Sequence, residues 1–160
     1  MLTVGTLQLI PGVIGGALTC IPFAIMAWLS YIFAIEIWIS DVTRGEQEIP
    51  EESKGKAVAW ALAFTLCLLG GSIATAWWVA SQGYGFWAAT LAAYWVQVVI
   101  NLFDLVVIDI LIYQWMKPKL MDIPGVPRLE GTWPHVIGAA KGLIVGVFLA
   151  LIAGAISLLA

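Results

Sequence analysis

Long apolar runs alternate with short polar segments along the chain. Four runs have the length of about 20 mostly apolar residues that a membrane-spanning helix needs, at residues 13–39, 58–80, 86–116 and 135–160. They are apolar all round, whereas strands of a transmembrane β-barrel show about ten residues of alternating polarity. The pattern predicts an all-α, polytopic integral membrane protein, one domain of four transmembrane helices over residues 1–160, with loops at 41–56, 81–85 and 117–134.

The composition excludes the main soluble classes. Of the 160 residues, 62% are hydrophobic and 11% are charged, against about 45–50% and about 25% in a soluble domain. The net charge of −3 leaves no basic surface for nucleic acid. Residues 1–12 contain no lysine or arginine, so the first run is expected to be a retained anchor and not a signal peptide. Cys20 and Cys67 lie inside predicted spans and form no metal or disulfide motif.

The basic residues predict the orientation. All seven lie in or beside the two longer loops: Arg44, Lys54, Lys56, Lys117, Lys119, Arg128 and Lys141. Because loops rich in lysine and arginine stay in the cytoplasm, both termini are expected on the non-cytoplasmic side. Aromatic residues at the span ends agree with this frame. They are Trp38, Trp60, Trp115 and Trp133 at the inner ends, and Trp77, Trp78, Tyr84 and Trp87 at the outer ends.

Small residues recur at every fourth position in three spans. The fourth span has Gly138, Gly142, Gly146, Ala150 and Gly154. Similar stripes are Gly12, Gly16, Cys20 and Ala24 in the first span, and Ala59, Ala63, Cys67, Gly71 and Thr75 in the second. Small residues let membrane helices approach closely, which drives their association in lipid. The stripes either pack the helices of one chain together, or the fourth-span stripe faces another subunit.

Polar residues follow one side of the third span. At about 100° per residue, Thr90, Gln97, Asn101 and Asp104 share a stripe. Asp104 lies about 18 Å from the inner end, near the midplane, with no basic residue predicted at its depth. Three interpretations remain open for the stripe: hydrogen bonding between helices, a path for protons or cations, or contact with a partner protein or a polar cofactor.

A second polar group is predicted nearer the cytoplasm. Asp109 is about 10 Å deep and Lys141 about 9 Å deep, so the two are expected to form an ion pair between the third and fourth spans. This pair either sets the helix register or acts as a charge relay or substrate clamp. Asp109 lies about 140° around the helix from Asp104, so the two carboxylates are not expected to share a face. Glu36 and His135 are expected at the rim.

The C-terminal half resembles a known family. The run NLFDLVVID at 101–109, the Lys-Pro-Lys at 117–119, the Pro-Gly at 124–125 and the sequence HVIGAAKG at 135–142 are similar to a family of small, uncharacterised four-helix membrane proteins of bacteria. The resemblance implies four membrane helices and the bacterial cytoplasmic (inner) membrane. It marks Asn101, Asp104, Asp109, His135 and Lys141 as signature polar positions and implies no activity.

Catalytic sequence motifs are missing. The sequence has no G-x-S-x-G, H-E-x-x-H or P-loop, and one histidine is too few for a typical zinc site. The leading expectation is a non-catalytic subunit or accessory protein that packs with a larger membrane complex, its cofactor unspecified. The alternative is an oligomeric proton or cation channel or transporter that uses Asp104. The third is a membrane enzyme acting on lipid or quinone.

Overall fold

The regular structure is helical throughout the described part of the chain. A computed structural model describes residues 4–33, 51–119 and 131–159. Its elements are α1 (Val4–Ile32), α3 (Glu51–Ser81), α4 (Phe86–Phe103), η2 (Asp104–Met116) and α5 (Trp133–Ser157). α4 continues directly into η2, so four long helical segments result, each long and apolar enough to cross a membrane. The predicted all-helical class, with four helices long and apolar enough to span a membrane, is confirmed.

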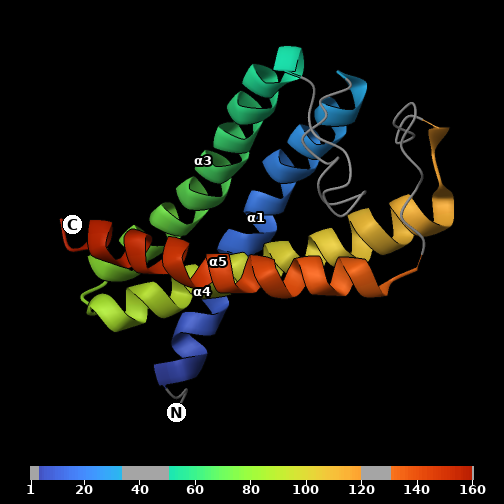
Figure 1. Ribbon diagram of the computed structural model, residues 1–160. Coiled ribbons are helices and arrows are strands. Elements are labelled where there is room, and N and C mark those ends of the chain that lie inside the picture. Colours follow the sequence, from blue (N-terminus) through green and yellow to red (C-terminus); the bar gives the residue numbers. More distant parts are fainter. Residues whose placement is uncertain (1–3, 34–50, 120–130, 160) are drawn as a thin grey trace.

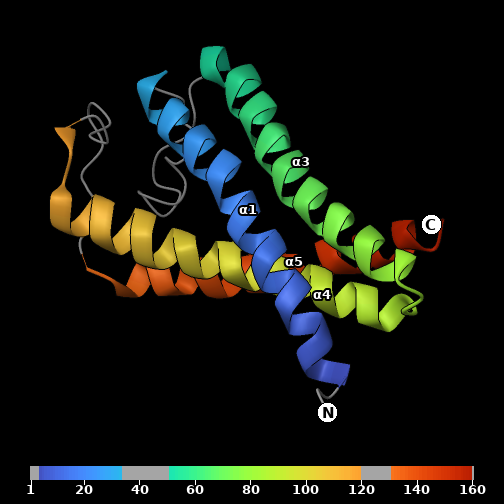
Figure 2. The same cartoon turned by 180° about the vertical axis from the view of Figure 1, so that it is seen from behind.

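α4 is the central helix and packs against α1, α3 and α5. α1 and α3 form one pair, while α4–η2 and α5 run antiparallel as a second pair, and the two pairs cross at α4 (Figure 1). Beyond the crossing, α1 and α3 lean away from η2, as the reverse view also shows (Figure 2). Only α5 therefore accompanies η2 to its end.

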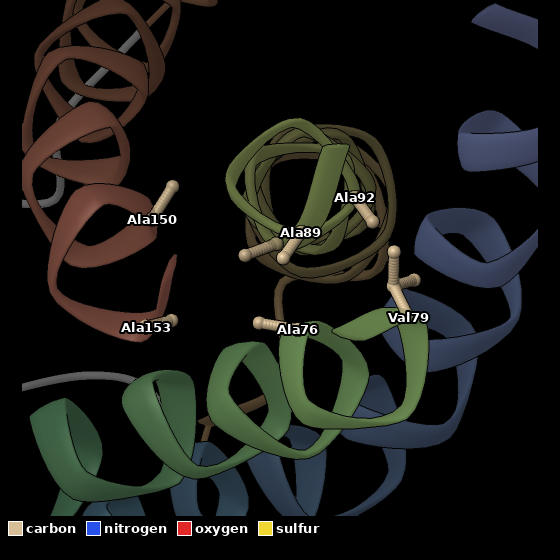
Figure 3. Close-up of a cluster of buried hydrophobic side chains, with 7 residues drawn as sticks. Ala76, Val79, Ala89, Ala92, Ala150 and Ala153 are labelled. Carbon is tan, nitrogen blue, oxygen red and sulfur yellow. The ribbon is translucent and has the colours of Figure 1, made fainter. Parts of the chain in front are cut away.

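The core at the crossing is made mainly of alanine. Figure 3 shows this cluster where α3, α4 and α5 meet. It consists of Ala76, Val79, Ala89, Ala92, Ala93, Ala150 and Ala153, all at most 2% exposed. Because small side chains let helix backbones approach closely, the packing contacts between helices are gained without large apolar groups. Larger apolar side chains form a second buried cluster between α1, α3 and α4, which includes Phe23, Phe64 and Ile100. Others are exposed along α1, α3 and α5, where lipid is expected.

Two helices begin earlier than the sequence pattern predicts. α1 starts at Val4 instead of residue 13 and runs through Pro11 and Pro22. Membrane helices tolerate proline because neighbouring groups satisfy the freed backbone, and lipid favours an unbroken helix. α3 starts at Glu51, inside the predicted loop.

The third span changes helix type at its middle, which the sequence does not predict. From Asp104 to Met116 the backbone is a π-helix, in which hydrogen bonds join residues five apart. The last such bond runs from the Lys117 N–H to the Ile112 carbonyl, at 3.0 Å. Asp104 and Asp109, also five apart, therefore lie about one turn from each other. The predicted separation of 140° between these two carboxylates, which assumed an α-helix, is wrong.

The end of η2 carries a strained residue. Lys117 has φ 46° and ψ 52°, and it is the only non-glycine residue at positive φ in the described part of the chain. A side chain in this left-handed region costs about 1–2 kcal/mol, whereas glycine occupies it freely.

We therefore expect Lys117→Gly to raise the free energy of unfolding by about 1 kcal/mol. The measurement is denaturant unfolding in detergent micelles, followed by circular dichroism. Lys119→Gly removes the same charge two residues later without relieving a positive φ. It should be neutral or destabilising, and equal stabilisation by both variants would contradict the strain at Lys117.

Candidate functional site

The polar side of α4 packs directly on the glycines of α5. At each of three α5 glycines an added Cβ would collide with a polar α4 side chain. The pairs are Thr90 with Gly154, Gln97 with Gly146, and Asn101 with Gly142. A Cβ on Gly146 would lie 2.8 Å from the Cβ of Gln97, a distance that real structures do not allow. The predicted polar stripe and the predicted small-residue stripe therefore contact each other within one chain.

Gln97 lies at the centre of this packing, and both hydrogens of its amide NH2 group are donated in hydrogen bonds. Its Nε2 donates to the Ser72 Oγ at 2.7 Å and to the Leu68 carbonyl at 3.1 Å, both on α3. The Ser72 hydroxyl in turn donates to the Ala93 carbonyl at 3.4 Å. Gln97 is 1% exposed and Ser72 is 0% exposed. This network ties α3 to α4, so the amide serves the contact between helices.

The neighbouring polar residues of the stripe differ in their contacts. Asn101 donates from its Nδ2 to the Gln97 carbonyl at 2.9 Å, within the same helix. The Thr90 hydroxyl is buried against Gly154 and makes no hydrogen bond to a described residue. Asp104 is half-buried at the α-to-π junction. From Thr90 to Asn101 the polar stripe of α4 is therefore covered by α5. Asp104 lies at the level where α1 and α3 begin to lean away from the third span.

The glycines of the remaining small-residue stripes also pack inside the chain, whereas Ala59 of α3 is exposed. Gly12 and Gly16 of α1 lie against Trp95 and Val99 of α4, and Gly71 of α3 lies against Thr19. Gly138 differs, because nothing lies within 4 Å of the position its Cβ would take. Gly138 therefore makes no close helix contact within the described part of this chain, and its packing against another subunit stays a prediction. Here α5 faces outward.

A second polar cluster joins the end of η2 to the start of α5. The Asp109 Oδ2 lies 3.2 Å from the His135 Nδ1, and the His135 Nε2 lies 2.9 Å from the Gln114 Nε2. Gln114 also donates from Nε2 to the Gly131 carbonyl at 3.3 Å. The Tyr113 ring contacts the His135 ring edge to face, with centroids 5.5 Å apart. We call these four side chains, Asp109, Tyr113, Gln114 and His135, the inner cluster.

The contacts of Gln114 assign the histidine tautomer. A carbonyl only accepts, so the Gln114 nitrogen that reaches Gly131 is the amide donor. That nitrogen also meets the His135 Nε2, which must therefore accept a hydrogen bond. The ring proton is then on Nδ1 and is donated to the Asp109 carboxylate. Matched donors and acceptors thus link η2 to α5 and to Gly131, two residues before α5.

The predicted pair of Asp109 with Lys141 is wrong. Asp109 pairs with His135, while Lys141 is exposed and has no carboxylate partner among the described residues. The depth estimate assumed the rise of an α-helix. The wider π-helical turn leaves less of the fixed Cα spacing of about 3.8 Å for axial rise. Asp109 therefore lies closer to the inner end of its helix, level with the start of α5.

Sequence reasoning missed three residues of these networks: Ser72, Tyr113 and Gln114. Ser72 is an isolated polar residue in the middle of the second span, the same signal that identified Gln97. Gln114 and Tyr113 lie at the inner end of the third span, level with His135, so the depth argument applied to His135 would have included them. Glu36, expected at the same rim, lies outside the described residues.

The side chains at these sites offer hydrogen-bond donors and acceptors and groups that can bind a proton. In residues 4–33, 51–119 and 131–159, no three histidine, cysteine or acidic side chains converge as a metal site requires. Comparison with protein-family models, curated proteins and solved structures gives no match. The family resemblance of about residues 95–142 therefore stays a prediction.

Proposed function

We propose that the chain is a non-catalytic membrane subunit or accessory protein that packs with a larger membrane complex. One observation carries this proposal: the midplane polar residues are used to hold the helices together. Gln97 is 1% exposed, its donors are taken by α3, and Gly146 of α5 packs against its stem. A side chain in this state supplies neither a water path nor a reactive group, which favours a packing role.

The outer surface supports a partner within the membrane. Exposed large apolar residues cover α5, namely Ile144, Val145, Val147, Phe148, Leu151 and Ile152. Tryptophans are exposed at both ends of the α4–η2 segment, Trp87 at 75% and Trp115 at 75%, as expected of interfacial belts. We propose a bacterial cytoplasmic membrane location with both termini outside. The partner is another membrane protein or a second copy of this chain.

Native mass spectrometry of the protein, gently purified from its own membranes, tests this proposal. The expected result is a mass that includes other protein subunits. A lone chain or a homo-oligomer that carries only lipid would contradict the role in a larger complex. A tagged chain extracted in the same detergent after mixing with membranes that lack it controls for partners acquired during purification.

A second candidate, a proton or cation transporter, is favoured by the position of Asp104. This carboxyl group lies where the span changes from α- to π-helix, and π-helical segments occur frequently at functional sites. From this point η2 is accompanied by α5 alone, and the inner cluster follows toward its end.

Under this candidate, we expect Asp104→Asn to abolish ion or proton flux in liposomes. The amide keeps the size of the carboxyl group but cannot carry its charge or proton. Circular dichroism and the monodispersity of the variant check that its fold is retained. Flux equal to that of the unsubstituted chain would exclude Asp104 as the transport site.

A further inference from the structure

We propose that the end of the η2–α5 hairpin binds the phosphate group of an anionic phospholipid, with Lys141 as its deepest cation. The proposal requires only that these helices span a membrane, so it holds whether or not the chain is a subunit. Lys141 lies within the fourth span and is exposed. Charged residues inside membrane spans usually face the interior and are paired. Lys141 has no acidic partner among the described residues, so its charge is available to an anionic group of the membrane.

The shape of α5 directs the Lys141 side chain toward the membrane surface. Helical side chains lean toward the helix N-terminus, over residues three and four positions earlier. The residue three positions earlier is Gly138, which has open space around it. Lys141 lies eight residues after Trp133, or about 12 Å along the helix. A lysine stem bent over Gly138 brings its ammonium group close to the headgroup region, as snorkelling lysines do.

Two further lysines lie at the same end of the hairpin. η2 ends beside the start of α5 (Figure 1), and both Lys117 and Lys119 follow directly after η2 and are exposed. The carboxylate of Asp109, the acidic residue of this end within the described residues, is already engaged by His135. Counted over the described residues, this surface is therefore positive, as expected for a site that recruits acidic lipid headgroups.

The surroundings favour a lipid over a soluble anion or a protein carboxylate. Trp115 and Trp133 are exposed at 75% and 69%, and such tryptophans lie at headgroup level. On the helix face that continues from Lys141, Val145 and Phe148 are exposed at 55% and 63%. A phospholipid fits both the charged group and the apolar face, because its phosphate contacts Lys141 while its acyl chains cover Val145 and Phe148.

Native mass spectrometry of the full chain, titrated in detergent with phosphatidylglycerol or phosphatidylcholine, tests the site. We expect preferential retention of phosphatidylglycerol, and we expect Lys141→Gln to weaken that retention about fivefold, since one lysine near an anionic headgroup contributes about 1 kcal/mol. Lys141→Arg should retain binding. Lys56→Gln, an exposed lysine near the start of α3, should leave it unchanged, and phosphatidylcholine binding should not respond to any variant.

Three results would overturn the site. Equal phosphatidylglycerol retention by Lys141→Gln and the unsubstituted chain would remove Lys141 from it. Equal weakening by Lys56→Gln would show attraction by net charge alone. Loss of a co-purifying protein from Lys141→Gln, with lipid retention unchanged, would mean that the counter-charge is a carboxylate of a partner helix. Thermal unfolding of each variant confirms that the helices remain folded.

Discussion

Gly146→Leu is expected to destabilise the chain by about 3 kcal/mol or more, because overpacking a tight helix contact forces the backbones apart. Even the first carbon of the new side chain would lie 2.8 Å from the Cβ of Gln97. The Gln97 Cβ is bonded directly to the α4 backbone, so no rotation of the side chain can move it away. Separating α5 from α4 at this point would also disturb the hydrogen bonds that Gln97 donates to α3. The measurement is the free energy of unfolding in mixed detergent micelles.

Gly138→Leu is the matched control, since it makes the same change two turns earlier on the same helix. Nothing lies within 4 Å of a Cβ at Gly138. The free energy of unfolding of Gly138→Leu should therefore stay within about 0.5 kcal/mol of that of the unsubstituted chain. A large loss at Gly138 together with a small loss at Gly146 would mean that another subunit covers Gly138 and that α5 does not pack on α4 through Gly146.

Asp109 and His135 are expected to be coupled in a double-mutant cycle. Asp109→Ala should cost about 1–3 kcal/mol, because it removes the acceptor of the His135 ring proton from a side chain that is 10% exposed. The double variant Asp109→Ala with His135→Ala should cost less than the sum of the two single changes, by about 1–2 kcal/mol. Chemical unfolding of the four proteins in one detergent gives the coupling energy.

The corresponding cycle with Lys141 separates the observed contact from the pair that the sequence predicts. Asp109→Ala and Lys141→Ala should be additive within about 0.5 kcal/mol, because Asp109 pairs with His135 and Lys141 is exposed. Strong coupling between Asp109 and Lys141, with none between Asp109 and His135, would show that the inner cluster is arranged differently from the structure described above.

The sequence predicts those site residues whose side chains have a high free-energy cost in lipid, because this cost is apparent without knowing their neighbours. Gln97, Asn101 and Asp109 stand out because polar groups are expensive inside a span. Their partners are less evident. Ser72 and Gln114 differ little in type from many weakly polar residues, and they become important only because Gln97 and His135 lie opposite them. Pairing across helices depends on depth and rotation, which one sequence does not specify.

The sequence by itself determined the all-helical class of the protein and its four candidate membrane spans. Runs of about 20 apolar residues have one stable solution in lipid, a helix that satisfies its own backbone hydrogen bonds. The spacing of Gly142, Gly146 and Gly154 likewise identified a close helix contact. Only the tertiary structure decided which helix fills that contact, that η2 is a π-helix, and that His135 replaces Lys141 as the partner of Asp109. The reason is physical: the cost of burying each group is local to its residue, whereas helix type, axial position and rotation depend on contacts between helices far apart in the chain.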